Sequence, residues 1–220
     1  MSKEQGYEFS RLFPTKSWQL FKNFLPTNST IAKKNSKKKI LLFVGRFVPE
    51  KGIYEVLKAF EQLLSLNIRQ GNNLVLWFVG DGPEIRKLQK GIEKHDPFSV
   101  CILGEVGSRK LDEIYSKSFV LLLPSYKEAF PYVVIEAMRA GLPLIVTPTG
   151  ILPDLIKQGQ NGFIVPPRDS KAIANAVCSL LDDALLYNRM CKNSYSCFRR
   201  YYSRNAAETY YQKLLDESFD

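Results

Sequence analysis

Short apolar runs alternate with amphipathic stretches from residue 40 onward. Each run is of strand length and is nearly continuous in Ile, Leu, Val and Phe, which is typical of strands buried on both faces of a parallel sheet. The apolar runs lie at 40–44, 74–79, 100–103, 119–123, 144–146 and 163–165.

The stretches between these runs carry apolar residues at helical spacing. Strands that alternate with helices predict βαβ units, whose right-handed crossovers build a doubly wound sheet. We therefore expect an α/β fold with a single Rossmann-like, doubly wound parallel sheet of about six strands and helices on both faces. The helices are expected at 52–67, 83–94, 109–117, 131–140, 152–158 and 170–182, followed by two more at 186–198 and 203–217.

Residues 1–38 differ from the rest of the chain, because they are polar and basic and end in a lysine-rich run. We interpret 1–38 as a basic extension or linker and 39–220 as the Rossmann-like domain with its carboxyl-terminal helices. Within the extension, four apolar residues recur at helical spacing. This stripe can pack on the domain, touch a membrane or meet a partner, and it consists of Trp18, Phe21, Phe24 and Leu25.

The net charge of +9 is concentrated at the two ends of the chain. Residues 1–39 carry nine Lys or Arg against two Glu, and residues 189–204 carry five Lys or Arg and no acid. Because residues 40–188 are balanced, no nucleic-acid groove through the core is expected. The basic ends either are solvated or make a peripheral contact with anionic lipid, and the pattern leaves both open.

No apolar run approaches the roughly 18–20 residues that span a bilayer, and the first residues lack the apolar stretch of a signal peptide. We therefore expect a cytoplasmic protein, at the inner face of the membrane if its basic ends contact lipid. The cysteines form no CxxC pair and have no His at metal-ligand spacing, so reduced thiols and no metal site are expected. They are Cys101, Cys178, Cys191 and Cys197.

The segment after the first apolar run is a candidate phosphate loop. Gly45 falls at the carboxyl end of the predicted strand, where a missing Cβ lets a ligand approach the backbone. Arg46 offers a planar fork and Lys51 a point charge for phosphate oxygens. A helix that opens near Gly52 would add free N–H groups and a positive dipole. An ordinary surface turn explains these residues equally well.

A second loop, at residues 80–83, again follows a strand and precedes a helix. Pro83 suits the first turn of that helix, and Asp81 is placed to cap it. We interpret this loop mainly as a tight turn at the rim of the cleft.

Two glutamates stand out in the stretch 128–138. Pro131 fits the first turn of a helix that is apolar nearly all round except for Glu136. A buried carboxylate without a partner costs several kcal/mol as an order of magnitude, so Glu136 needs a cation, backbone N–H groups or a ligand hydroxyl. Glu128 precedes this helix on the same crevice side as Gly45, where two acids would suit sugar hydroxyls. The structural alternative is that Glu128 is an acid at the helix N-terminus and that Glu136 forms a buried ion pair.

The ordered series of motifs resembles the retaining group 1 (family 4) glycosyltransferases, over about residues 40–183. Those enzymes have the GT-B fold, with two Rossmann-like domains and the active site between them, and this sequence resembles the carboxyl-terminal one. The motifs are Gly45-Arg46 with Lys51-Gly52, Gly80-Asp81-Gly82-Pro83, Gly104-Glu105-Val106, Pro124-Ser125, Glu128 separated by seven residues from Glu136-Ala137-Met138, Ala140-Gly141-Leu142-Pro143 and Asn161-Gly162-Phe163.

The resemblance implies a role for each matching residue. Arg46 and Lys51 would grip the donor diphosphate, and Gly45 would let it approach. Glu128 would hold hydroxyls of the transferred sugar and Glu136 those of the ribose. The catalytic residues would be Arg46, Lys51 and Glu128. The segment that ends at Val106 would meet the base, and backbone groups around Phe130, Pro131 and Tyr132 would face the phosphates.

The implied function is transfer of a hexose from a nucleotide diphosphate sugar to an acceptor with retention, as in polysaccharide or glycolipid biosynthesis. The nucleotide sugar is a co-substrate, and neither a metal nor another cofactor is expected, because two cations can neutralise the leaving group. One departure from the family pattern is Gly150-Ile151, where a Gly-Gly pair is usual. We expect Ile151 to crowd or reshape the sugar end of the pocket.

A GT-B enzyme also needs an amino-terminal, acceptor-binding domain that residues 1–38 are too short to supply. The chain would then be a fragment, a truncated product or one subunit of a split enzyme, and we expect it to be inactive without an amino-terminal domain or partner chain. The alternative function is a non-catalytic or regulatory subunit that retains the fold.

Overall fold

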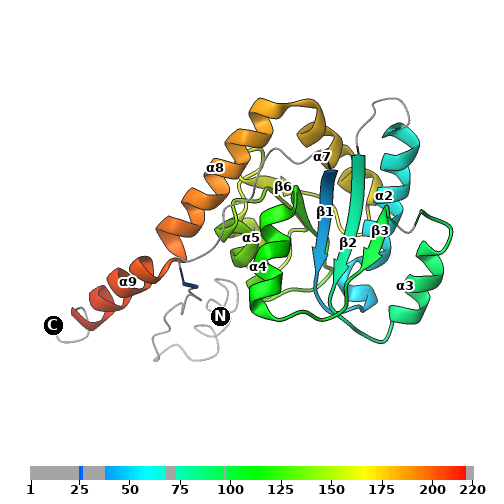
Figure 1. Cartoon of the computed structure of the whole chain (residues 1–220). Helices are drawn as coiled ribbons and strands as arrows, with labels where there is room; N and C mark the ends of the chain where they lie inside the picture. The colour runs from blue at the N-terminus through cyan, green and yellow to red at the C-terminus, as the bar shows by residue number, and fades with distance from the viewer. Residues whose placement is uncertain (1–24, 27–37, 68–72, 97, 217–220) are drawn as a thin grey trace.

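The computed structural model describes residues 25–26, 38–67, 73–96 and 98–216. In this part of the chain, six parallel strands form one sheet in the order β3-β2-β1-β4-β5-β6 (Figure 1). The prediction of a doubly wound sheet is therefore confirmed. The strands are β1 Lys38–Val44, β2 Asn73–Val79, β3 Val100–Ile102, β4 Val120–Leu123, β5 Leu144–Val146 and β6 Gly162–Ile164.

The strand order reverses direction beside β1. The chain builds outward from β1 to β3 and then returns to place β4 against the other side of β1, with Leu41 opposite both Leu76 and Val120. In open α/β sheets, such a switch point leaves a crevice beyond the carboxyl ends of the two central strands. The fold thus directs attention to the loops that follow β1 and β4.

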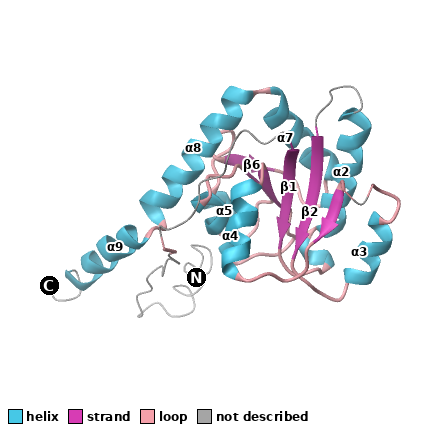
Figure 2. Ribbon diagram, in the orientation of Figure 1, coloured by secondary structure: helices cyan, strands magenta, loops and turns pink. Residues whose placement is uncertain are grey.

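Helices cover both faces of the sheet (Figures 1 and 2). Right-handed crossovers put α2 and α3 on one face, where α2 also packs against α7, while α4 and α5 pack together on the other and α8 lies against α5 and α7. The helices are the 3₁₀ helix η1 Pro49–Lys51, α2 Ile53–Asn67, α3 Ile85–Ile92, α4 Ser108–Lys117, α5 Tyr132–Arg139, α6 Leu152–Leu155, α7 Ser170–Asp182, α8 Ala184–Tyr201 and α9 Arg204–Asp216.

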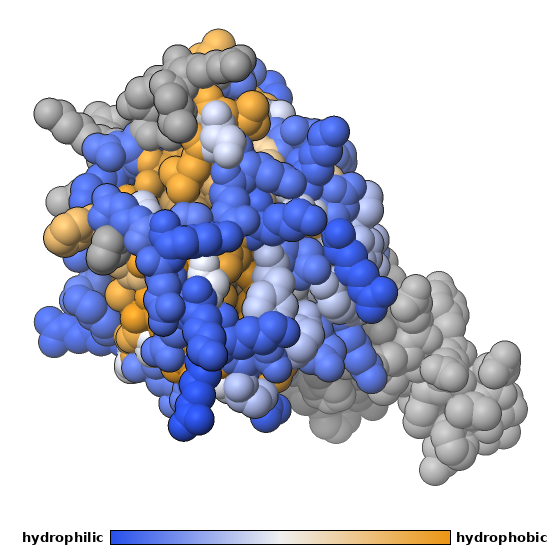
Figure 3. Space-filling view, turned by 90° about the vertical axis from the view of Figure 1, so that its right-hand side faces the viewer, coloured by the Kyte–Doolittle hydropathy of each residue, from blue (hydrophilic) through white to orange (hydrophobic). Residues whose placement is uncertain are grey.

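The core lies along the central strands, which are buried on both faces as the continuous apolar runs predict. All four residues of β4 are buried, and Phe43 and Phe78 pack with ring centroids 5.6 Å apart. Viewed from the side of α3 and the edge strand β3, polar side chains cover most of the surface and apolar ones show between them (Figure 3).

Two predicted helix starts are wrong. Helix α3 begins at Ile85 rather than at Pro83, and Asp81 does not cap it, because the Asp81 carboxylate accepts a hydrogen bond from the Gly82 N–H at 2.6 Å. Pro131 is not in the first turn of α5 but is the residue before it. In both cases the proline stands at the turn that leads into the helix.

Two other helices differ in length from the prediction. Helix α6 stops at Leu155, because Ile156 is extended and buried and the Asn161 side chain binds the backbone on both sides of it. Helix α8 begins earlier than predicted, because Asp183 caps it by accepting from the N–H groups of Leu185 and Leu186 at 2.9 and 2.8 Å.

The end of α8 meets the start of the described chain. Leu25 donates its backbone N–H to the Tyr202 carbonyl at 2.9 Å and packs against the core, while α9 extends away from the sheet (Figure 1). Trp18, Phe21 and Phe24, the rest of the predicted apolar stripe, lie outside the described residues. Among the residues described, no helix is long and apolar enough to cross a membrane.

Candidate functional site

The loops after β1 and β4 are joined at the switch point by backbone contacts. Tyr126 donates its N–H to the Glu50 carbonyl at 2.7 Å. Gly52, between η1 and α2, has φ 72° and lies so close to Pro124 that a Cβ on Gly52 would stand 2.4 Å from the Pro124 carbonyl oxygen. Only glycine fits both the left-handed backbone and this approach. The 3₁₀ turn that carries Lys51 is therefore held against the end of β4.

This arrangement brings Lys51 and Glu128 into an ion pair. The Glu128 side chain is 8% exposed and the Lys51 side chain 27%. Ser125, which is fully buried, donates its hydroxyl to the same Glu128 oxygen at 3.1 Å. A carboxylate this deep needs such partners, because an uncompensated charge is costly away from water. Two of the predicted catalytic residues are thus in direct contact.

The loop after β5 supports Glu128 from the other side. Gly150 has φ 55°, and a Cβ there would stand 2.3 Å from the Glu128 carbonyl oxygen. Ile151 donates its N–H to the Ala129 carbonyl at 3.2 Å. Ile151 is buried and lines a cavity between α6 and α8 that is not lined by Lys51 or Glu128. The departure from a Gly-Gly pair therefore alters the wall of that cavity.

A cleft of about 360 Å³ opens beside the ends of β1 and β2. Backbone hydrogen bonds join these strand ends. The Gly45 N–H donates to the Val79 carbonyl at 3.0 Å, and the Gly80 N–H donates to the Gly104 carbonyl at 2.9 Å. A Cβ on Gly80 would stand 2.1 Å from the Gly45 oxygen, so glycine is required there. The residues that line the cleft are Gly45, Arg46, Gly80, Asp81, Gly82 and Glu105.

The Arg46 side chain is exposed at this cleft, and the loop that carries it is fixed by its backbone. Phe47 donates its N–H to the Asp81 carbonyl at 2.7 Å, and Gly82 fits against Phe47 with no room for a Cβ. The Phe47 side chain is fully buried. A rigid backbone therefore presents an accessible guanidinium, which suits the recognition of phosphate oxygens.

Glu136 has a protein partner that the sequence did not reveal. The hydroxyl of Tyr115, on α4, donates to Glu136 Oε2 at 2.9 Å. Burial raises the pKa of Tyr115 well above its usual value, and the neighbouring Glu136 carboxylate raises it further. The Tyr115 hydroxyl therefore stays protonated and donates. The one signal in the sequence that could have indicated Tyr115 was its position beside Ile114 on the apolar face of α4.

A second contact between the same helices lies next to this hydrogen bond. Arg139, which is 8% exposed, forms an ion pair with Asp112 of α4 and also donates to the Pro26 carbonyl at 3.3 Å. Helix α5, which carries Glu136, is thereby fixed to α4 by two side-chain contacts.

The remaining predicted residues stand at the start of α5 and after β3. Phe130 packs edge-on against Tyr132 and Tyr202, with centroids 6.3 and 6.4 Å away. Helix α5 begins at Tyr132, which is 49% exposed, with Pro131 before it and no side-chain cap. Backbone N–H groups of the first helical turn are therefore the donors that this segment offers. Val106 is partly buried against the core.

A cluster of three side chains supports the loop between β4 and α5, and sequence reasoning missed it. Arg168 lies over the Tyr126 ring, 4.9 Å from its centroid, and has φ 62°, which is uncommon for a non-glycine residue. The Tyr126 hydroxyl interacts with Glu55 of α2. Burial and Glu55 together raise the pKa of Tyr126 to about 12. The three side chains of the cluster come from segments that are far apart in the chain.

Comparison with known proteins places this chain in a family. The profile of the family described as glycosyl transferases group 1 matches residues 26–196. The N-acetyl-alpha-D-glucosaminyl L-malate synthase of Bacillus anthracis is 31% identical over 191 residues, which make up 83% of this chain and 48% of the synthase. The chain spans about half the length, or less, of the curated relatives that it matches.

Solved structures share the fold. The carboxyl-terminal domain of the group 1 glycosyl transferase LpcC from Francisella tularensis superposes with a TM-score of 0.70 at 20% identity, over 82% of this chain and 99% of that one. Anabaena Alr3699/HepE, solved with UDP and glucose, superposes with a TM-score of 0.80 at 17% identity, over 98% of this chain and 61% of that one. These matches confirm the expected Rossmann-like half of a GT-B fold. Because the family profile covers most of the chain and the fold agrees, this chain belongs to the glycosyl transferases group 1.

Proposed function

We propose that the chain binds the nucleotide diphosphate sugar of a retaining hexosyltransferase at the switch point between β1 and β4. The observation that carries the proposal is the contact of Lys51 with Glu128, which sets a cation for phosphate and an acceptor for sugar hydroxyls side by side. The cleft that Arg46 lines supports it with a second cation.

In this proposal, catalysis consists of positioning and charge stabilisation. The bond between the anomeric carbon and the diphosphate oxygen breaks, and the acceptor hydroxyl attacks that carbon from the face that the leaving group departs. The proton of the acceptor hydroxyl passes to the departing diphosphate oxygen. Arg46 and Lys51 stabilise the negative charge that develops on the diphosphate. Because these two side chains supply the positive charge, we propose that the donor needs no metal ion.

The two glutamates are assigned to the two sugars of the donor. Without a ligand, the ion pair with Lys51 compensates the buried Glu128 carboxylate. With a donor bound, Lys51 turns to the diphosphate, and Glu128 accepts from the transferred hexose. Tyr115 holds Glu136 Oε2, so that Oε1 is oriented to accept from the ribose hydroxyls. The segment around Val106 meets the base, and the backbone at the start of α5 faces the phosphates.

The acceptor is proposed to bind elsewhere than on this chain. The match to an isolated carboxyl-terminal domain and the span of about half the curated relatives support an amino-terminal domain, or a partner chain, that completes the cleft. We therefore propose that this chain alone binds the donor and does not complete a transfer.

Calorimetry with UDP, GDP and ADP, each with and without Mg²⁺, tests the donor site. Binding of one of these diphosphates to the chain, weakened in Arg46→Ala and unchanged by Mg²⁺, is the expected result. If none of the three diphosphates binds at millimolar concentration, the donor site is ruled out.

A second candidate is a non-catalytic or regulatory subunit that keeps the fold. The observation that favours it is Ile151 in place of the second glycine. Reconstitution with the amino-terminal domain of a relative separates the two candidates. Donor-dependent transfer or donor hydrolysis supports the enzyme, and binding of the diphosphate without turnover supports the subunit.

A further inference from the structure

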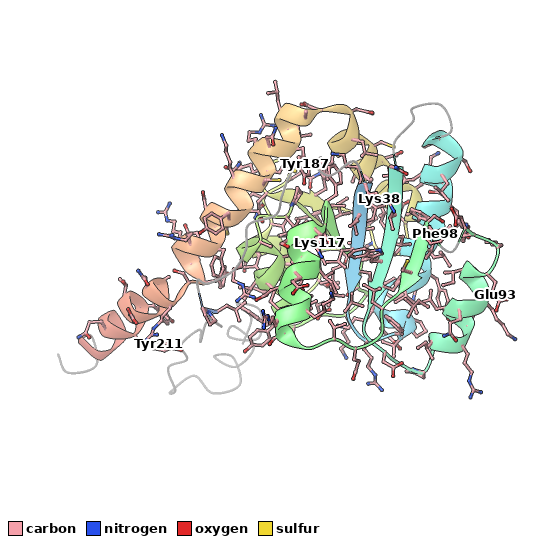
Figure 4. All side chains as sticks on the ribbon, in the orientation of Figure 1. Lys38, Glu93, Phe98, Lys117, Tyr187 and Tyr211 are labelled. Carbon is pink, nitrogen blue, oxygen red and sulfur yellow. The ribbon has the colours of Figure 1, made fainter. Side chains whose placement is uncertain are left out.

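Helix α8 carries four basic residues and no acid along its 18 residues. Its inner side is apolar and packs against α5 and α7, with Tyr187, Met190 and Phe198 buried. The helix is therefore firmly seated on the domain, and its charged side chains have to project outward. Nitrogen-tipped side chains stand along its outer edge in Figure 4.

The outer side chains of α8 form one stripe. With about 100° between successive helical residues, five exposed positions fall within an arc of about 80°. Leu185, at the first turn, is 82% exposed. The stripe consists of Leu185, Arg189, Lys192, Ser196 and Arg199.

The positive charge of this stripe is not neutralised within the described part of the chain. Arg189, Lys192 and Arg199 take part in none of the ion pairs found among those residues. Arg200, beside the stripe, lies 5.2 Å from the Tyr201 ring centroid. Surface charges on proteins are usually interspersed in sign, so an acid-free face of this length is available for an anionic partner.

We propose that the outer face of α8 rests on an anionic lipid surface, with its axis in the plane of the headgroups. The three cations meet the lipid phosphates, and the exposed Leu185 enters the apolar boundary. An exposed leucine in line with the cations adds affinity for lipid but none for a polyanion in water, which favours lipid over nucleic acid. The proposal does not depend on donor binding.

Vesicle sedimentation with the full chain tests this surface. Vesicles of phosphatidylcholine alone are compared with vesicles that also contain phosphatidylglycerol, at low and high salt. Binding that needs phosphatidylglycerol and falls with salt is expected. In Arg189→Gln/Lys192→Gln/Arg199→Gln the partition coefficient should fall by about fivefold per side chain, or on the order of a hundredfold.

A matched variant controls for the change in net charge. Helix α3, at the opposite end of the molecule in Figure 1, carries three exposed cations with Glu84 just before the helix and Glu93 just after it. Arg86→Gln/Lys87→Gln/Lys90→Gln should lower the partition coefficient by less than about threefold, because these charges are not part of the α8 stripe. The single variant Arg199→Gln, expected to lose about fivefold, serves if the triple variant does not fold.

The variant Leu185→Gln distinguishes binding to a lipid surface from binding to other polyanions. It should lower binding to vesicles and leave binding to heparin or duplex DNA unchanged. The proposal is overturned if the chain binds phosphatidylcholine equally well, if the α8 triple variant binds vesicles like the unmodified chain, if the α3 variant loses as much, or if Leu185→Gln leaves vesicle binding intact.

Discussion

Lys51 and Glu128, 77 positions apart in the chain, form an ion pair across the loops that follow β1 and β4. The pair depends on two glycines, Gly52 and Gly150, that let three loops approach one another at backbone distance. Its partners are thus placed by the backbone before any ligand arrives, and this organisation makes the following predictions possible.

A double-mutant cycle should show that the pair is coupled. Lys51→Met leaves the Glu128 carboxylate with Ser125 as its remaining side-chain donor, so the free energy of unfolding should fall by about 1–3 kcal/mol. The further change Glu128→Gln should recover part of this loss, with a coupling energy of about 0.5–3 kcal/mol. Urea unfolding of the four proteins measures it, and additivity of the two single changes would contradict it.

Arg46→Ala should separate binding from folding. The Arg46 side chain is exposed, so the free energy of unfolding should change by less than about 0.5 kcal/mol. If Arg46 contacts the diphosphate, calorimetry should show an affinity roughly 10–100-fold lower, as expected for the loss of a charge-assisted hydrogen bond. Arg109→Ala, at an exposed cation on α4, is the matched control and should leave the affinity unchanged.

Gly52→Ala should be far more harmful than Gly159→Ala, although both glycines have φ 72°. At Gly159 a Cβ meets nothing within 4 Å, so only the left-handed backbone is strained, at about 1–2 kcal/mol. At Gly52 the same Cβ would also overlap Pro124, and the loss should exceed that of Gly159→Ala by at least about 1 kcal/mol. Equal unfolding midpoints of the two variants would be the contrary result.

Tyr115→Phe should test the support of Glu136. Removal of the buried hydroxyl deprives the carboxylate of its donor, and the free energy of unfolding should fall by about 1–3 kcal/mol. If Glu136 also binds ribose, the affinity for the diphosphate should fall as well, whereas the affinity for inorganic pyrophosphate should not. A loss of stability without any change in nucleotide affinity would leave Glu136 as a structural residue only.

Alkaline pH should weaken the fold partly through Tyr126. Its folded-state pKa of about 12 lies above the ordinary value of about 10, so its contribution to stability is complete below pH 10 and is lost as the pH rises toward 12. In Tyr126→Phe the free energy of unfolding should decline less steeply over this interval. Glu55→Gln should lower the Tyr126 pKa, and spectrophotometric titration of the phenol measures that shift.

The sequence predicted the strands and the doubly wound parallel sheet well, because each strand is buried on both faces and therefore appears as a continuous apolar run. Helix ends were predicted less well. Helix α8 begins directly after its cap, Asp183, whereas its first buried residue is Tyr187. In α3, the proline that suits a first turn lies two residues before the helix, since a proline fits the preceding turn as easily.

For the candidate site, the sequence indicated which residues matter but not how they are held. Glu136 could be singled out as a lone acid on an apolar helix, yet its partner Tyr115 comes from another helix and looks like an ordinary core aromatic. The cluster of Arg168 with Tyr126 likewise joins loops that follow different strands. Such contacts depend on the tertiary fold, and no spacing along the chain encodes them.

The backbone hydrogen bonds that join Gly45 to Val79 and Gly80 to Gly104 have a consequence for protein engineering. Because main-chain atoms hold the cleft walls, the side chains that line the cleft can be varied without moving them. A library that randomises Arg46, Asp81 and Glu105 while keeping the glycines should therefore consist largely of folded proteins that differ in ligand preference.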